Sequence, residues 1–196
     1  MIDNSPKWHQ AKLALRREVL AKVRPARVLD LFAGRGEMWR GAWHLADGYL
    51  GVDQRPWRSD EPHHRLMLDN AQAVEKLRLG AYNVFDLDAY GEPWSMALAI
   101  AERRRWVLGE VGSLVLTDGS SAKLRFGGRI ASLEALIPRH PDTGLRDVTE
   151  DVHRQAIGAW CVWSGVEPTW WSPAGGLTGR GSSKMLYSAV VFVGRG

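Results

Sequence analysis

Short apolar runs alternate along the chain with segments whose apolar residues follow helical spacing. Each run is about as long as a buried strand and ends in a polar residue or a glycine-containing turn. The predicted strands span 26–31, 49–53, 65–68, 82–87 and 112–117. The predicted helices between and after them span 36–46, 71–78, 93–107 and 120–137. This alternation predicts an α/β fold built on a mostly parallel sheet.

The two ends of the chain add further elements to this pattern. Ser5-Pro6 is typical of a helix start, and the apolar spacing that follows predicts a helix to about residue 23. Near the other end, Asp147 and Glu150 favour the start of a helix that continues to Trp163. Two final strands, 167–172 and 185–193, form a terminal β pair. No internal repeat or domain boundary is visible, so residues 1–196 are expected to form a single domain.

The most informative loop follows the first predicted strand, where Val28-Leu29-Asp30-Leu31-Phe32-Ala33 leads into Gly34-Arg35-Gly36. Two glycines directly after a buried strand indicate a tight turn whose backbone approaches a ligand closely. The fingerprint for dinucleotides has a third glycine three residues later, where this chain has Trp39. The loop therefore favours a nucleoside ligand without a pyrophosphate.

Three acids stand at the ends of the first three predicted strands. They are Asp30, Asp53 and Asp69, and the carboxyl ends of parallel strands are where an open α/β sheet binds its ligands. Asp53 lies 17 residues after Gly36, near the spacing of about 20 residues expected for a ribose-binding carboxylate. A carboxylate suits that role because it can accept hydrogen bonds from both ribose hydroxyls.

Together the glycine loop and these strand ends resemble the class I S-adenosylmethionine-dependent methyltransferases over roughly residues 25 to 193. The resemblance implies a Rossmann-like fold with a seven-stranded, mostly parallel sheet and a terminal antiparallel β pair. It implies S-adenosyl-L-methionine as cofactor and no metal. The cofactor-binding residues that it implies are Asp30, Phe32, Gly34, Gly36, Asp53, Asp69, Asn70 and Asp86.

The fourth predicted strand and the residues after it narrow the resemblance. Asp86-Leu87-Asp88-Ala89-Tyr90-Gly91-Glu92-Pro93 is similar to the Asp-x-Asp-Pro-Tyr/Phe-Gly-x-Pro motif of the tRNA guanine-N2 dimethyltransferases, and Thr117-Asp118 matches that family after its fifth strand. Ala89 stands where that family has proline. The resemblance implies that Asp88 faces the target amine and that Tyr90 flanks the base. An aromatic ring can hold a base by stacking, worth about 1–3 kcal/mol.

These motifs favour methyl transfer to an amine of a nucleic-acid base, in RNA or DNA. Two alternatives stay open: a methyltransferase of a small-molecule or protein amine, and a non-catalytic nucleic-acid-binding or scaffold protein that retains the fold. Cofactor binding would separate the last of these from the enzymes, and salt-sensitive binding to nucleic acid would separate the first from the second.

Charge is unevenly distributed, because residues 1–27 contain seven basic and two acidic residues whereas the whole chain has a net charge of only +4. A basic N-terminal helix within residues 1–24 is suited to a polyanion, and a solvated helix face is the alternative. A single cysteine, Cys161, favours a reducing compartment and hence the cytoplasm. The chain has no run of about 18 apolar residues, so no membrane span is predicted. His63-His64 has no further ligand at suitable spacing, so no metal site is expected.

Ten tryptophans are unusual for 196 residues. Trp39 and Trp43 lie four apart and are expected to face the core, as are Trp160 and Trp163. The others lie near predicted strand ends or loops, where ordinary packing is the expected role and stacking of a base is the alternative. They are Trp57, Trp94, Trp170 and Trp171. Cys161 is expected to be a buried helix residue.

Overall fold

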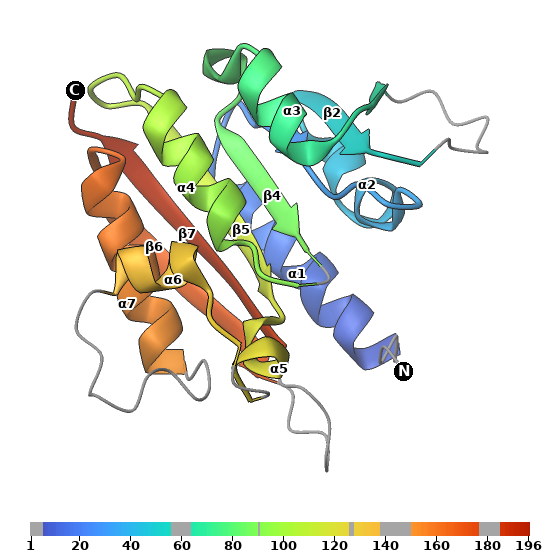
Figure 1. Ribbon diagram of the computed structural model, residues 1–196. Coiled ribbons are helices and arrows are strands. Elements are labelled where there is room, and N and C mark those ends of the chain that lie inside the picture. The colour runs from blue at the N-terminus through green and yellow to red at the C-terminus, as the bar shows by residue number, and fades with distance from the viewer. Residues whose placement is uncertain (1–5, 56–63, 90, 126–127, 138–149, 177–184) are drawn as a thin grey trace.

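The computed structural model describes residues 6–55, 64–89, 91–125, 128–137, 150–176 and 185–196. Its centre is a seven-stranded sheet with the order β3-β2-β1-β4-β5-β7-β6 (Figure 1). β1 to β5 run parallel, β7 pairs antiparallel with β5, and β6 pairs antiparallel with β7. The predicted fold class, including the terminal antiparallel pair, is therefore confirmed.

The strands lie close to their predicted positions. They are β1 (Arg27–Asp30), β2 (Gly48–Asp53), β3 (Arg65–Met67), β4 (Val84–Asp88), β5 (Val111–Asp118), β6 (Val166–Gly176) and β7 (Leu186–Gly194). The inner strands β1, β4 and β5 are buried almost throughout because helices cover both faces of the sheet. Strand order reverses between β1 and β4, and this reversal is the place where open α/β sheets bind ligands.

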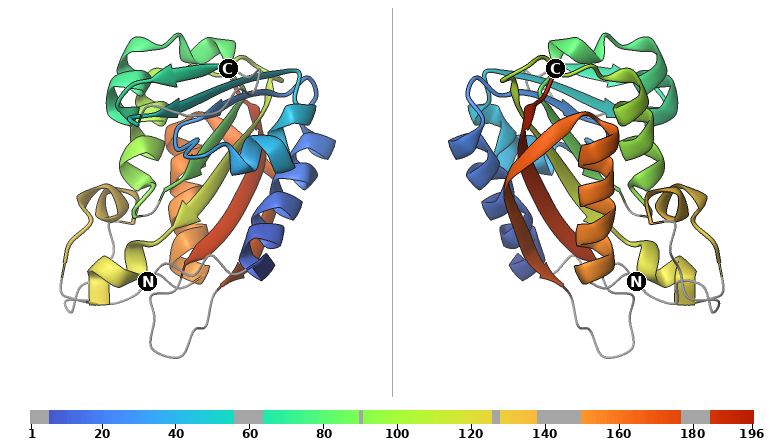
Figure 2. Two further views of the ribbon diagram at one scale, coloured as in Figure 1. Left: turned by 90° about the vertical axis from the view of Figure 1, so that its right-hand side faces the viewer. Right: turned by 90° about the vertical axis from the view of Figure 1, so that its left-hand side faces the viewer.

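Helices form a layer on each side of the sheet (Figure 2). One face packs against α3 (Asn70–Lys76), α4 (Trp94–Arg103), α6 (Ala131–Leu136) and α7 (Glu150–Trp163), and the other against α1 (Pro6–Lys22) and α2 (Glu37–Gly41). A short helix, α5 (Ser120–Arg125), follows β5. Among the described residues, no helix is both long and apolar enough to cross a lipid bilayer.

The N-terminal helix α1 is part of the core. Leu15 and Val19 are at most 2% exposed, and α1 packs against α2, β6 and β7. Gly41 at the end of α2 allows α1 to approach closely, since an added Cβ would lie 2.4 Å from a methyl carbon of Leu13. The inward face of α1 is therefore buried, and both predicted roles of its basic residues, binding a polyanion or forming a solvated face, concern the outward face.

Two predicted helices are shorter than expected. The segment 36–46 forms α2 and then a 3₁₀ turn at Trp43–Leu45, because the backbone leaves helical geometry at Ala42 and turns Trp43 fully into the core. The segment 120–137 forms α5 and α6, and Gly128 between them has low helix propensity. Trp160 and Cys161 are buried as predicted, whereas Trp163 is half exposed.

Candidate active site

The glycine loop joins β1 to α2 at the carboxyl edge of the sheet. Gly34 and Gly36 have φ angles of 48° and 71°, which lie in the left-handed region that favours glycine. The amide of Gly36 donates to the carbonyl of Ala33 at 2.8 Å, and the amide of Ala33 donates to the carbonyl of Val52 at 3.0 Å. The two glycines therefore make a tight turn that is fixed to the neighbouring strand β2.

Asp53, at the end of β2, binds the same loop. One carboxylate oxygen accepts a hydrogen bond from the amide of Gly34 at 3.0 Å, and the other accepts from the amide of Arg55 at 2.9 Å. The side chain remains partly exposed. A carboxylate oxygen can accept more than one hydrogen bond, so Asp53 can hold the loop and still bind ribose hydroxyls.

Replacing Asp53 by alanine should weaken binding of S-adenosylhomocysteine by about tenfold to a hundredfold. The reason is that a hydrogen bond to a charged group contributes about 1.5–3 kcal/mol. Isothermal titration calorimetry on the folded variant measures the effect. Asp151→Ala, which removes an exposed carboxylate from α7, should bind like the wild type. Wild-type affinity in Asp53→Ala would refute the ribose assignment.

Asp69 and Asn70, where β3 leads into α3, lie at the same carboxyl edge of the sheet. Asp69 caps α3 by accepting from the amides of Ala71 and Gln72 at 2.9 and 3.2 Å, and its second oxygen accepts from Gln54. These hydrogen bonds, led by the one from Gln72, hold the pKa of Asp69 below its usual range. The buried side-chain oxygen of Asn70 has no hydrogen-bond donor among the described residues.

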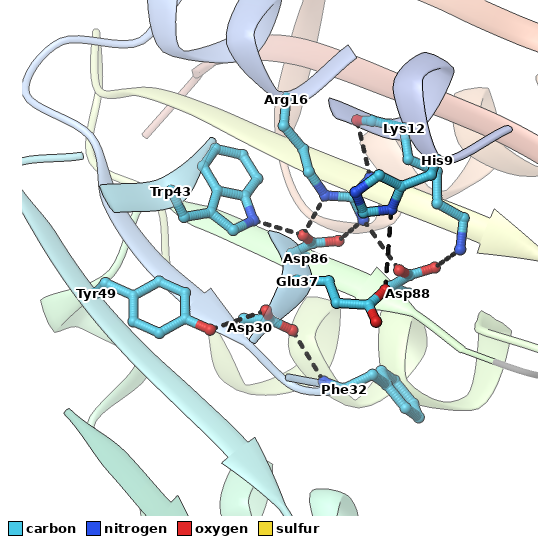
Figure 3. Close-up of polar contacts among 10 residues, drawn as sticks. All are labelled: His9, Lys12, Arg16, Asp30, Phe32, Glu37, Trp43, Tyr49, Asp86 and Asp88. Carbon is cyan, nitrogen blue, oxygen red and sulfur yellow. Dashed lines mark hydrogen bonds and ion pairs between the residues drawn. The ribbon is translucent and has the colours of Figure 1, made fainter. Parts of the chain in front are cut away.

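Strand β4 ends in two carboxylates that α1 contacts directly (Figure 3). The guanidinium of Arg16 donates to both oxygens of Asp86 at 2.7 Å, and the indole of Trp43 donates to one of them at 2.6 Å. Asp86 is fully buried, so it has no surface for a cofactor. We therefore reassign Asp86 from cofactor binding to holding α1 and the Trp43 turn against the sheet.

Asp88, two residues further along β4, faces the same helix but is nearer the surface. Lys12 donates to it at 2.5 Å, and Arg16 lies 3.7 Å from its other oxygen. Its side chain is 14% exposed. Burial acts to raise the pKa of Asp88, but the positive charges of Arg16 and Lys12 outweigh burial and lower the pKa. Asp88 is therefore a charged acceptor at neutral pH.

Asp30 lies beneath the glycine loop and is 1% exposed. It accepts hydrogen bonds from the amide of Phe32 at 3.1 Å and from the hydroxyl of Tyr49 at 3.0 Å. Burial, followed by the charge of Asp86, raises the pKa of Asp30 well above its usual value. Its position under the loop links the end of β1 to β2.

Asp30→Asn should stabilise the protein increasingly as the pH rises from about 4 to about 8. A raised pKa means that the folded state binds the proton more tightly, so this group's stabilising contribution is present at low pH and is lost as the pH rises through the folded pKa. Asparagine keeps an acceptor oxygen and does not titrate. Thermal melts of both proteins across this range measure the difference, with Asp47→Asn as the control. A difference independent of pH would contradict the expectation.

Sequence patterns identified most of this edge but missed its partners from α1. The strand order brings together Asp30, Gly34, Gly36, Asp53, Asp69, Asn70 and Asp88. His9, Lys12 and Arg16 were not predicted as site residues. They share one helical face, and His9 lies 3.8 Å from Glu37 of α2. The sequence shows their helical spacing, but this spacing does not indicate which strand they contact. Tyr90 lies outside the described residues.

Comparisons with known proteins gave matches in structure only. No family model and no curated protein matches the sequence. The fold is similar to N-methyltransferase NodS from Bradyrhizobium japonicum WM9 in complex with S-adenosyl-L-homocysteine, at 11% identity over 96% of this chain and 89% of that chain, with a TM-score of 0.58.

Two further solved structures have the same architecture. Trm1 from Pyrococcus horikoshii, in complex with S-adenosyl-L-methionine, is 14% identical with a TM-score of 0.58, and the match covers 99% of this chain but only 57% of Trm1. TYW2 from M. jannaschii, in complex with AdoMet, is 8% identical with a TM-score of 0.55, over 98% of this chain and 78% of that chain. The chain therefore has the fold of the class I S-adenosylmethionine-dependent methyltransferases.

Proposed function

We propose that this protein transfers a methyl group from S-adenosylmethionine to an amine of a nucleic-acid base. The observation that carries the proposal is the placement of Asp88. This acceptor ends β4 next to the reversal of strand order, and its charge is balanced by Lys12 and Arg16.

Several residues fit the proposed cofactor. Gly34 and Gly36 have no side chains, so a ligand can approach the backbone closely at these two positions, and Asp53 offers carboxylate oxygens at the end of β2. The side-chain oxygen of Asn70, to which no described residue donates, can accept a hydrogen bond from a ligand N–H group. When bound, S-adenosylmethionine supplies an electrophilic methyl group. The residues of the chain then have to align the attacking nitrogen with it, and such alignment can account for a large part of a rate enhancement.

Asp88 is suited to orient an amine because an ionised carboxylate accepts N–H hydrogen bonds without donating any. An amine on a base has its lone pair delocalised into the ring, so it is a weak nucleophile whose orientation matters. Accepting its hydrogens at Asp88 would turn the lone pair toward the methyl group.

The charge balance at Asp88 favours a neutral amine over an aliphatic ammonium. Two carboxylates, Asp86 and Asp88, face two cations, Arg16 and Lys12, in a largely buried cluster. The pKa of the third acid, Asp30, is raised, which favours its neutral form. A protonated lysine side chain would therefore add an unbalanced positive charge, which is costly at low exposure. Base amines are neutral at physiological pH.

One experiment tests the cofactor and the substrate separately. The purified protein is titrated with S-adenosylhomocysteine, and it is incubated with labelled S-adenosylmethionine and total RNA, DNA and protein. We expect binding, and label in a nucleic-acid fraction that Asp88→Ala abolishes. Label only in protein or small molecules would contradict the base-amine assignment. Failure to bind S-adenosylhomocysteine would favour a non-catalytic scaffold.

A further inference from the structure

A third buried carboxylate, Asp118, ends β5 and joins four elements of the fold. One of its oxygens accepts from the indole of Trp94 at 2.8 Å and lies 3.1 Å from Nδ1 of His153. The other oxygen accepts from the amide of Ser120 at 2.8 Å. Trp94 begins α4, His153 belongs to α7, and Ser120 begins α5. The orientation of each element is therefore tied to one side chain.

His153 completes this network on its other side. Its Nε2 forms a short hydrogen bond with the hydroxyl of Ser188 on β7, and its ring meets the indole of Trp94 edge-on at 5.1 Å. Donation from Nδ1 to Asp118 leaves Nε2 to accept from the hydroxyl. The order serine, histidine, aspartate is that of a hydrolytic triad, but all three residues are at most 2% exposed. A substrate has no access to Ser188, so the network is an internal link.

The link reaches the turn that follows Asp88. The amide of Gly119, next to Asp118, donates to the carbonyl of Gly91 at 2.8 Å. Glu92 accepts from the amide of Ser95 at 3.0 Å and from the hydroxyl of Ser132 on α6 at 3.1 Å. Lys12 and Arg16 thus hold the start of the connection from β4 to α4, at Asp88. The Asp118 network holds its other end, where the chain enters α4.

We propose that His153 is a positioning residue for the methyl transfer, acting through Asp118 and Trp94 to fix the turn that follows Asp88. This inference rests on the proposed function. The imidazole and the indole contact the same oxygen of Asp118, so together they fix the position of this buried carboxylate. Loss of this support would let the turn move, and small misplacements of a reacting group reduce rates strongly.

Hydrogen exchange and methyl transfer on the full chain test this role with His153→Leu and His153→Asn. The side-chain amide nitrogen of asparagine can take the place of Nδ1, so His153→Asn keeps the donor to Asp118, whereas leucine removes it. For His153→Leu we expect faster amide exchange in a peptide spanning 88–94. We also expect kcat for RNA or DNA labelling to fall by about tenfold or more. KM and S-adenosylhomocysteine affinity should stay within about twofold, and His153→Asn should recover most of kcat.

Ile157→Val, also buried on α7, is the matched control because it weakens packing without touching Asp118. Its exchange over 88–94 should equal that of the wild type. Unchanged exchange in His153→Leu, or equal losses in the Leu and Asn variants, would overturn the positioning role. Exchange requires no substrate, so it decides whether His153 fixes the turn after Asp88 even if labelling shows that the proposed reaction is wrong.

Discussion

Asp88→Ala should bind S-adenosylhomocysteine with nearly wild-type affinity and lose methyl transfer by about 10²-fold or more. The carboxylate ends β4 beyond the residues expected to hold the cofactor, and its cationic partners keep it ionised. Removing it takes away the acceptor proposed to orient the target amine and leaves the glycine loop and Asp53 intact. Calorimetry with S-adenosylhomocysteine and single-turnover labelling of nucleic acid measure the two effects separately.

Asp88→Asn is the informative companion variant. It keeps one acceptor oxygen of similar position but loses the charge that Lys12 and Arg16 balance, so it should retain part of the rate. Melting temperatures of both variants separate catalysis from folding. If Asp88→Ala loses several degrees of melting temperature yet labels nucleic acid at the wild-type rate, Asp88 is a structural carboxylate. The base-amine proposal would then lose its main support.

Arg16→Met should lower the free energy of unfolding by about 3–5 kcal/mol, because it leaves the carboxylate of Asp86 buried without its cation. Arg16 is 1% exposed and donates to both oxygens of Asp86. For a chain of this size the expected fall in melting temperature is on the order of 10 °C. Thermal and urea denaturation of the purified variant measure it.

Arg17→Met is the matched control, since the neighbouring Arg17 is exposed and, within the described parts of the chain, donates only to the carbonyl of Gly41. Its effect should be within about 1 kcal/mol. A double variant, Arg16→Met with Asp86→Leu, should be more stable than Arg16→Met alone because the buried carboxylate that loses its cation is removed as well. A small effect of Arg16→Met would mean that Asp86 is neutral in the folded protein and that the ion pair contributes little.

Periodicity was sufficient to predict the sheet, because inner strands of a parallel sheet are continuous apolar runs and their ends are marked by acids and glycines. It failed where tertiary contacts override local preference. The helix after the glycine loop ends at Gly41 because α1 approaches it closely and Trp43 must reach Asp86. For Trp94, local sequence left both core packing and contact with a base open, and the structure shows that it is buried and donates to Asp118.

The site could be predicted only where residues close in sequence act together. Gly34, Gly36 and Asp53 belong to one β-α-β unit, so their spacing carries the information. Arg16 and Asp86 are 70 residues apart, and either could have been an ordinary surface charge. The same holds for His153 and Asp118, whose contact depends on how α7 packs against the sheet. Each of these contacts depends on the order of the strands in the sheet, which the sequences of the separate strands do not reveal.

The packing of α1 against β7 has a consequence for how the chain is made. α1 is synthesised well before β7, the strand against which it packs. Contacts between such distant segments form late in folding because of the loop entropy that must first be overcome. A truncated chain without β7 would therefore hold α1 poorly and leave the acids of β4 without secure partners. The charge balance at Asp88 thus depends on synthesis of the chain having reached β7.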